Sequence, residues 1–140
     1  MSEQIAFELV SPEEKLVSEP VALAVIPGTE GEMGVGAGHA SFVVALKPGV
    51  VQLYKEQDGE ARRIFIAGGF ADVTGENCTV LAEEAVNVQD LDQADLEQEI
   101  RNLNEDLGTA SESADKARVE KKLALVTAKL EAVTEKVVLS

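Results

Sequence analysis

The residues of this chain that could do chemistry gather in one glycine-rich stretch, residues 26–49. It reads IPGTEGEMGVGAGHASFVVALKPG and holds six of the eleven glycines, the only histidine, His39, and the acidic pair Glu30 and Glu32. Glycine is costly in backbone entropy, so this density indicates places where the backbone needs positive φ or approaches another group closely. We therefore interpret the stretch as a working surface.

No catalytic pattern is complete in this stretch. Gly34, Gly36 and Gly38 form GxGxG, but the dinucleotide fingerprint requires a further glycine where His39 stands, and a β-branched run follows instead of a helix. His39 and Ser41 could act as base and nucleophile, yet no orienting acid adjoins them. A single histidine and a single cysteine do not form a zinc site without several carboxylates. The sequence thus predicts no catalytic residue, no metal and no cofactor.

Charge excludes further classes of partner. The net charge is −14, with −9 over residues 1–88 (14 acidic, 5 basic) and −5 over residues 89–140 (12 acidic, 7 basic). Such a surface repels phosphate backbones and anionic lipid, so we expect no nucleic-acid binding and no direct lipid binding. The sequence has no apolar run of the roughly 18 residues that a membrane span needs, and MSEQIAFELV does not resemble a signal peptide. The predicted partner is a protein.

The stretch must be positioned by β-structure, because residues 2–88 alternate apolar and polar with frequent turn signals. Asp58-Gly59 and Gly75-Glu76-Asn77 are typical hairpin turns. Strands of this length at intervals of about ten residues predict an antiparallel sandwich or barrel. The expected strands cover residues 5–9, 21–25, 42–46, 51–55, 63–67, 70–73 and 78–82. Cys78 falls in the last of them, where a buried, inert thiol is expected.

The pattern becomes helical near Asp90. Leu96, Ile100, Leu103 and Leu107 are spaced by four, three and four residues, as on the apolar stripe of an amphipathic helix. Asp90 followed by Gln93 predicts the helix start, and Gly108 predicts its end.

A second helix is predicted after a short polar link, with Thr109 and Glu112 as its capping signature. Its apolar residues follow a heptad-like spacing, and a stripe of alanines lies about 100° round the helix. We expect an antiparallel hairpin whose alanine face rests on the β domain or on a partner. The apolar stripe is Val119, Leu123, Val126, Leu130, Val133 and Val137, and the alanine stripe is Ala114, Ala117, Ala124 and Ala128.

Several motifs, taken in order, resemble one family along essentially the whole chain. They are IPGTEGEMGV, GHA, ALKPGVV and IFIAGGFADVTGENCTVLAEEA, followed by the helical hairpin. Together they resemble the epsilon subunit of bacterial F-type ATP synthases. The resemblance implies an N-terminal all-β antiparallel sandwich of about ten strands (residues 1–88), which docks on the rotor. A C-terminal antiparallel α-helical hairpin (residues 89–140) would be regulatory.

The function implied by the resemblance is that of a non-catalytic central-stalk subunit. It would link the gamma subunit to the c-ring for rotational coupling in proton-driven ATP synthesis, peripheral to the cytoplasmic face of the bacterial inner membrane. The hairpin would restrain ATP hydrolysis by reaching the alpha and beta catalytic subunits. The alternative, from another class, is a free-standing adaptor with a β-sandwich and a helix-capturing hairpin; an enzyme comes third.

The resemblance also assigns contact residues. Glu30, Gly31 and Glu32 would touch the polar loops of c subunits, and His39 would lie in a loop near the gamma and ring contacts. The alternative for the acidic pair is a solvated turn. Candidate contacts with the acidic catalytic head lie on the second helix, where the alternative is a solvated face. These basic residues are Arg118, Lys121, Lys122 and Lys129.

The chain departs from the family pattern at two places. Relatives that sense ATP carry Leu or Ile, Asp, two variable residues, Arg and Ala; here Leu91 and Asp92 match, but Asp95 and Leu96 replace the Arg and Ala. An acid in place of a guanidinium repels triphosphate, so we expect no ATP binding. Two prolines usual around His39 are replaced by Ala37 and Ser41, and a bulky apolar residue by Gly36, which predicts a looser loop.

Overall fold

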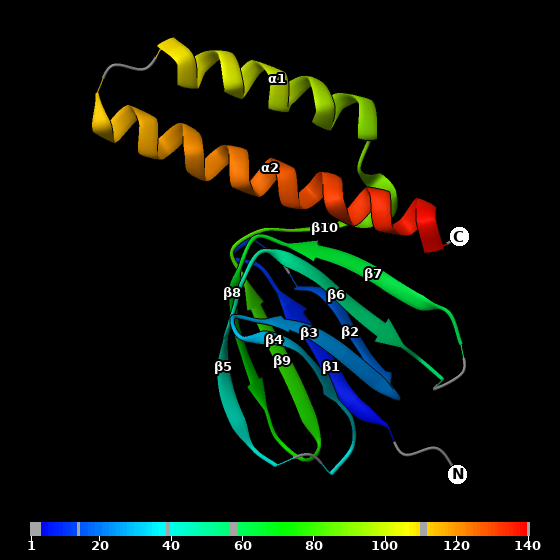
Figure 1. The fold of residues 1–140 in the computed structure, drawn as a ribbon. Coiled ribbons are helices and arrows are strands. Elements are labelled where there is room, and N and C mark those ends of the chain that lie inside the picture. Colours follow the sequence, from blue (N-terminus) through cyan, green and yellow to red (C-terminus); the bar gives the residue numbers. More distant parts are fainter. Residues whose placement is uncertain (1–3, 14, 39, 57–58, 110–111, 140) are drawn as a thin grey trace. The chain divides into compact units, whose positions relative to one another are not determined.

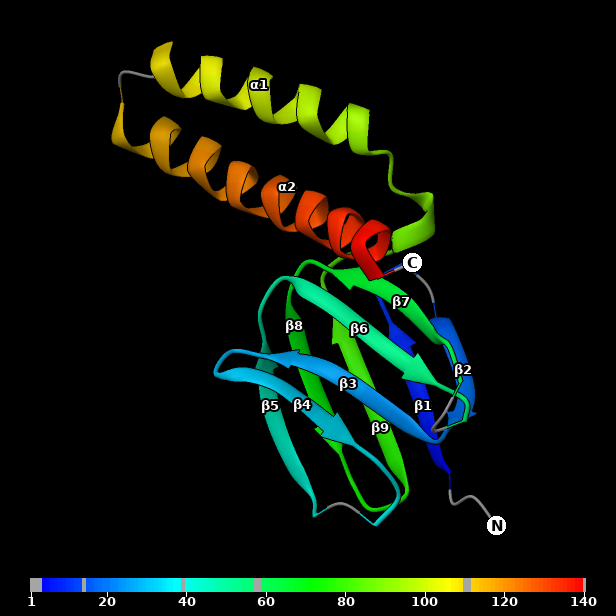
Figure 2. The ribbon, with the colours of Figure 1, turned by 45° about the vertical axis from the view of Figure 1, so that its right-hand side comes forward.

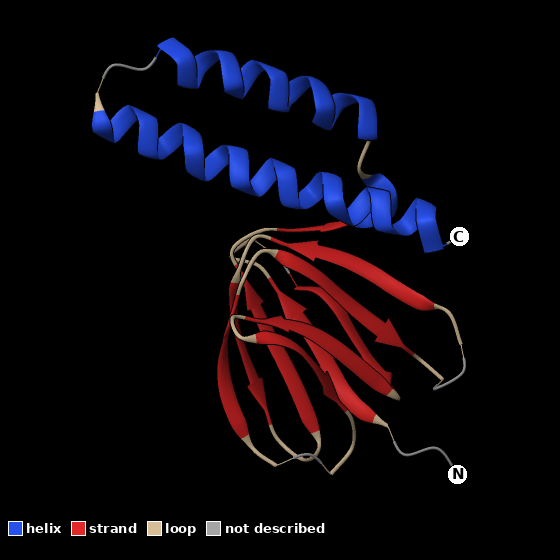
Figure 3. Cartoon of the chain, viewed as in Figure 1, coloured by secondary structure: helices blue, strands red, loops and turns tan. Residues whose placement is uncertain are grey.

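The computed structural model describes residues 4–13, 15–38, 40–56, 59–109 and 112–139. The chain divides into two compact units, Met1–Asn87 and Val88–Ser140. The first is built from strands and the second from helices (Figure 3).

The first unit is a ten-stranded sheet folded into two layers (Figure 1). Its strand order is β10-β7-β6-β3-β5-β8-β9-β1-β2. β4 lies outside this order and pairs with β3. All pairs are antiparallel except β1 with β9, which is parallel. The strands are β1 (Ile5–Val10), β2 (Lys15–Val21), β3 (Leu23–Gly28), β4 (Gly31–Val35), β5 (Phe42–Leu46), β6 (Gly49–Tyr54), β7 (Ala61–Ile66), β8 (Gly69–Val73), β9 (Asn77–Ala82) and β10 (Ala85–Asn87).

The two layers meet where β3 passes from β6 to β5. β3 pairs with β6 over Leu23–Val25, but it pairs with β5 only through Gly28 and Leu46. In Figure 2, β3, β4, β6 and β7 form the nearer layer, and β1, β8 and β9 lie behind it. The sandwich that the alternating pattern and the family resemblance predict is confirmed.

The core between the layers is built from the inward-facing side chains of the strands. Ile5, Phe7 and Leu9 alternate with more exposed residues along β1, as expected for a strand with one wet face. Aliphatic side chains fill most of the core, which agrees with the low aromatic content of 4%. The buried cluster is Ile5, Phe7, Leu9, Val17, Val21, Ala24, Ile26, Val35, Leu46, Val51, Leu53, Ile64, Ile66, Ala71, Val73, Cys78, Val80 and Ala82.

Three strands are missing from the sequence prediction, and each has a local reason. β2 contains Pro20 and three polar or charged residues in seven, which weakens its apolar alternation. β4 contains Gly31 and Gly34, which read as loop signals. β10 has only three residues. The glycine-rich stretch is therefore partly a strand and not only a loop.

The second unit is an antiparallel pair of helices, as predicted. A short 3₁₀ turn, η1 (Val88–Asp90), precedes α1 (Gln93–Thr109) and α2 (Ser113–Leu139). The described residues of the two apolar stripes pack together as expected, except that Leu107 is only half-buried and outside the cluster. The side chain of Val137, the last residue of the predicted stripe, lies outside the described part. The cluster consists of Leu96, Leu103, Val126 and Val133, with Leu91, Ile100, Val119, Leu123 and Leu130 packed against them.

The predicted helix ends are wrong by one to three residues. Asp90 closes η1, and the residue that caps α1 is Asp92, whose Oδ1 accepts a hydrogen bond from the Asp95 N–H at 3.1 Å. Gly108 lies inside α1, and Thr109 is its last residue. The Thr109 hydroxyl donates back to the carbonyl oxygens of Glu105 and Asp106, so it closes the first helix and does not open the second.

Gly69 gives a direct test of the β8–β9 pairing. Its φ is +143°, and a Cβ there would collide with the Leu81 carbonyl oxygen and approach the Ala82 Cα to 3.0 Å. We predict that Gly69→Ala lowers the free energy of unfolding by about 3 kcal/mol through backbone strain and lost pairing. Urea unfolding followed by the fluorescence of the single tyrosine, Tyr54, reports on this unit.

Gly34→Ala is the matched control for this variant. A Cβ at Gly34 would meet only the Leu23 Cδ1, at the ordinary contact distance of 3.6 Å. We expect a change within about 0.5 kcal/mol. Equal unfolding midpoints for the two variants would contradict the described strand pairing at Gly69.

Candidate functional site

The turn between β3 and β4 presents Glu30 to solvent. Gly28 and Gly31 are paired across it, which leaves Thr29 and Glu30 as a two-residue loop. Gly31 has a φ of +138°, and a Cβ on Gly28 would lie 2.8 Å from the Gly31 carbonyl oxygen. Both glycines are therefore required by the turn, which supports the interpretation of glycine density made from the sequence.

The same turn is fastened to the second layer of the sandwich. The Thr29 N–H donates to the Ala45 carbonyl at 3.1 Å, and the Lys47 N–H donates to the Pro27 carbonyl at 3.0 Å. Lys47 belongs to the Lys47-Pro48-Gly49 turn that follows β5. Glu30 thus stands on a turn that is held by strands of both layers.

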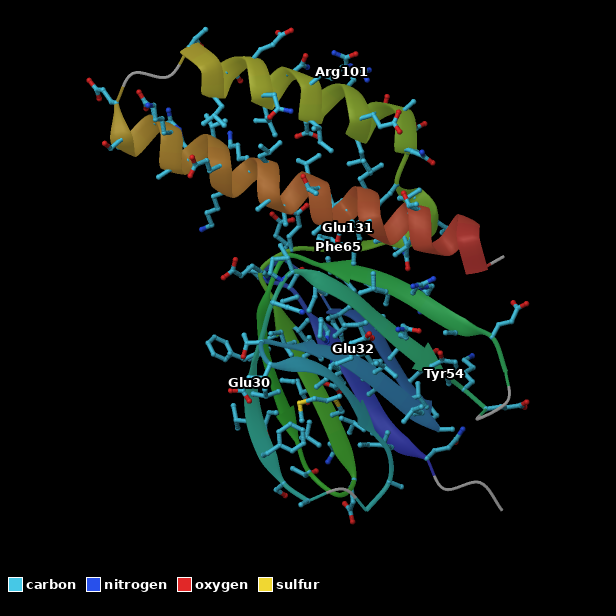
Figure 4. The ribbon with its side chains drawn as sticks, viewed as in Figure 1. Glu30, Glu32, Tyr54, Phe65, Arg101 and Glu131 are labelled. Atoms are coloured by element: carbon cyan, nitrogen blue, oxygen red, sulfur yellow. The ribbon has the colours of Figure 1, made fainter. Side chains whose placement is uncertain are left out.

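Glu32 lies one strand residue beyond the turn, on the outer face of β4. The Gln52 Nε2 donates to its Oε2 at 3.3 Å, and the Tyr54 hydroxyl donates to the Gln52 Oε1 at 3.1 Å. Figure 4 labels Glu30, Glu32 and Tyr54 among the side chains of the sandwich. The two carboxylates differ in their partners. Glu32 accepts a hydrogen bond from Gln52, whereas within the described residues Glu30 makes no side-chain hydrogen bond or ion pair.

Glu30 lies in the β3–β4 turn, and Gly31 and Glu32 are the first two residues of β4, so the three lie together as their sequence positions require. Their contact with a partner stays a prediction. His39, the fourth residue assigned to this surface, lies outside the described residues.

An exposed apolar face, which the sequence analysis missed, covers the outer side of β5, β8 and β9. Val43 is 70% exposed, Phe70 59% and Leu81 53%. Phe70 pairs with Ala45 on one side and with Leu81 on the other. We call Val43, Ala45, Phe70 and Leu81 the apolar face. Contiguous exposed apolar surface of this kind is typical of a protein interface.

A signal for the apolar face was present in the sequence. β5 reads FVVAL and is apolar on both of its sides, although only one side can point into the core. Its burial alternates, so Val43 and Ala45 point outward while Leu46 is buried. An apolar residue at every position of a strand in an antiparallel sandwich therefore indicated a second buried face in an assembly.

The basic residues of α2 do not form one cluster. Arg118 is engaged within its own helix, where its Nη2 lies 2.8 Å from the Asp115 Oδ1. Lys121 and Lys122 are exposed, and Lys129 is partly exposed. Consecutive residues point about 100° apart on a helix, so Lys121 and Lys122 serve different faces. The solvated-face alternative and the contact alternative both remain open for these four residues.

The start of α1 lacks features that a nucleotide site needs. Asp92, which matches the acidic position of the ATP-sensing motif, has its Oδ1 occupied by the Asp95 N–H. Asp95 itself is exposed and acidic. The helix N-terminus therefore already carries carboxylates where a phosphate would have to bind.

Other chemistry is equally unsupported in the sandwich. Burial raises the pKa of the Cys78 thiol to about 11, and the charge of Asp72 adds to the shift, so the thiol stays protonated and unreactive near neutral pH. A polar hollow of about 180 Å³ between Ser11 and Glu84 is smaller than the roughly 300 Å³ of typical ligand pockets. Within the described ranges, no three His, Cys, Asp or Glu residues are grouped to hold a metal ion.

Neither α1 nor α2, within the part of the sequence that the structure describes, is long and apolar enough to cross a bilayer.

Comparison with known proteins places both units in one family. Residues 4–88 match the beta-sandwich domain of the ATP synthase delta/epsilon chain, and residues 92–138 match the C-terminal domain of the ATP synthase epsilon chain. The protein is 46% identical over 135 residues to the ATP synthase epsilon chain of Rhodospirillum centenum, covering 94% of this chain and 92% of the relative. It is 41% identical over 132 residues to that of Rhodospirillum rubrum, covering 94% and 98%.

Solved structures agree with this placement. A subunit of the mitochondrial ATP synthase of Euglena gracilis, solved as OSCP/F1/c-ring, has a TM-score of 0.81 at 30% identity and covers 94% of this chain and 81% of its own length. A subunit from the central stalk and c-ring of the Tetrahymena thermophila enzyme shares the fold, with a TM-score of 0.63 at 12% identity. The two domain matches together span nearly the whole sequence, and the chain belongs to the ATP synthase epsilon-chain family.

Proposed function

We propose that this chain is the central-stalk subunit that joins the gamma subunit to the c-ring and transmits rotation between them. The observation that carries the proposal is the pair of dissimilar surfaces on one sandwich: the apolar face and the acidic β3–β4 turn. The Euglena relative was solved in an assembly containing F1 and the c-ring, which supports this placement.

The apolar face is suited to the gamma subunit. A rotor must keep its own parts fixed to one another, and burial of Phe70 and Leu81 contributes about 25 cal/mol per Å² of apolar area removed from water. Large aromatic side chains at the centre of an interface commonly carry much of the binding energy. Phe70 is the anchor that we assign to this contact.

The β3–β4 turn is suited to the c-ring. Glu30, Gly31 and Glu32 are polar, lie at one end of a rigid hairpin, and offer two carboxylates to basic groups on ring loops. His39 remains a candidate for the same region. Residues 1–88 would then form the rotor-docking domain, at the cytoplasmic face of a bacterial inner membrane.

Residues 89–140 are proposed as a regulatory hairpin without catalytic activity of its own. The two helices share one apolar cluster, while Ala114, Ala117 and Ala124 of α2 are exposed. An exposed small-residue stripe allows a second helix surface to approach closely in another state. Arg118, Lys121, Lys122 and Lys129 are the candidate contacts with the alpha and beta subunits in that state.

The first prediction concerns the apolar face. Phe70→Glu buries an unpaired charge in the proposed gamma interface, so the affinity for the gamma subunit falls by about 30-fold or more, corresponding to at least about 2 kcal/mol. The measurement is the affinity of the purified variant for an ATP synthase complex from which this subunit has been removed. Asn104→Glu, at an exposed position of α1, adds the same charge and should bind normally. Equal affinities would contradict the assignment.

The second prediction concerns the hairpin. Truncation after Val88 leaves the sandwich core intact, so assembly and coupling persist, while ATP hydrolysis rises by about fivefold if the hairpin contributes at least about 1 kcal/mol of coupling. A second, shorter truncation, after Thr109, removes α2 and keeps α1. It should give the same rise in ATP hydrolysis. If the truncated and full-length assemblies hydrolyse ATP at the same rate, this hairpin does not inhibit hydrolysis.

The third prediction concerns nucleotide. Because Asp95 stands at the arginine position and Asp92 is occupied as a cap, the isolated protein should show no ATP binding at micromolar concentrations. Isothermal titration with Mg-ATP measures this, with a family member that retains the arginine as positive control. A micromolar affinity would refute it.

A further inference from the structure

The side chains around Glu32 form an ordered series across three strands. Glu32 lies on β4 and Gln52 on β6, with β3 between them, and Val25 of β3 is paired with both Gly34 and Gln52. Neighbouring strands are about 4.8 Å apart, so the backbones of β4 and β6 are separated by about 10 Å. Only two long side chains that lean toward each other bridge such a gap.

The intervening residues leave room for this bridge. Gly34 has no side chain, and a Cβ there would have only the Leu23 Cδ1 nearby, at 3.6 Å. Leu23 and Val25 of the intervening strand β3 are half-buried. The Gln52–Glu32 hydrogen bond is exposed, whereas the Tyr54–Gln52 hydrogen bond is partly buried and so better shielded from water.

The direction of the Gln52 amide is fixed by the Glu32 carboxylate. A carboxylate only accepts hydrogen bonds, so the amide nitrogen must face Glu32, and it donates to Oε2 at 3.3 Å. The amide oxygen, Oε1, then accepts from the Tyr54 hydroxyl at 3.1 Å. Tyr54 and Gln52 are two residues apart on β6 and therefore point to the same side of the sheet. The hydroxyl, the amide and the carboxylate form one directed series.

A neutral donor orients a carboxylate without neutralising it. Within the described residues Glu32 makes no ion pair, in contrast to Glu19, which lies 3.7 Å from the Lys55 Nζ and 3.9 Å from the Arg62 Nη1. The full charge of Glu32 therefore remains available to a cation from outside the protein. Glu30, two residues earlier, has its charge available but makes no side-chain bond to any described residue that would orient it.

We propose that Gln52 and Tyr54 are positioning residues that hold the Glu32 carboxylate for a basic side chain on the partner of the β3–β4 turn. The inference rests on the proposed function, in which that partner is the c-ring. It assigns different roles to the two acids: Glu32 makes a directed contact, and Glu30 contributes only to the electrostatic field.

The test is a double-mutant cycle on the full-length protein, with affinity for a gamma–c-ring complex as the readout. Glu32→Gln should weaken binding about tenfold, whereas Gln52→Ala and Tyr54→Phe should each weaken it about threefold, as expected for loss of one hydrogen bond to an exposed charged group. The double variant Glu32→Gln/Gln52→Ala should bind no more weakly than Glu32→Gln alone. Glu30→Gln is the matched control for charge removal and should change affinity less than Glu32→Gln.

The outcomes separate the inference from the proposed function. Normal binding by Gln52→Ala and Tyr54→Phe, with weak binding by Glu32→Gln, would overturn the positioning role and leave the turn as a contact. Additive effects in the double variant would also overturn it, because Gln52 would then act independently of Glu32. Normal binding by Glu32→Gln would overturn both the positioning role of Gln52 and Tyr54 and the proposed contact between Glu32 and the c-ring.

A second measurement does not depend on the partner. In the isolated full-length protein, Tyr54→Phe should shift the side-chain amide resonances of Gln52, because the hydroxyl that orders that amide is lost. Unchanged resonances would show that the series does not form in solution, and would overturn the inference even if binding were impaired.

Discussion

The passage of β3 from one layer of the sandwich to the other is the constraint on which the rest of this unit depends. β3 pairs with β6 and β4 in one layer and reaches β5 through Gly28. Backbone hydrogen bonds from Thr29 and Lys47 close the corner. The β3–β4 turn, an exposed hairpin end, is therefore tied by backbone hydrogen bonds to the segment of β5 and the turn that follows it. A polar contact surface on a rotating part requires a base of that kind.

The two surfaces of the sandwich follow from the same corner. The carbonyl of Ala45 accepts the hydrogen bond that fastens the turn, while Ala45 itself pairs with Phe70 in the apolar face. The polar turn and the apolar face are therefore neighbours on one rigid frame. The two surfaces differ in chemistry, and each suits a different kind of contact. Burial of an apolar face suits a lasting contact, and an oriented charge suits a specific one.

The sequence predicts the architecture better than the surfaces. Alternation and turn signals predicted the sandwich, and the spacing of Leu96, Ile100 and Leu103 predicted the first helix. β4 was missed because it contains Gly31 and Gly34, and glycines in a sequence indicate a loop more often than a strand. The apolar face was missed because an outward Phe70 looks the same in sequence as an inward one; only the register decides. The Glu32–Gln52 bond joins residues 20 positions apart, on strands that β3 separates, and no local pattern reveals that they share one face of the sheet.

The central claim, that this sandwich joins two different parts of a rotor, is tested most directly by an electron cryo-microscopy map of the complete ATP synthase that contains this protein. The account predicts that Phe70 and Leu81 are buried against the gamma subunit, and that the β3–β4 turn faces the c-ring with Glu32 beside a basic side chain. A map in which the apolar face lies in solvent, or in which the turn points away from the ring, would contradict the account.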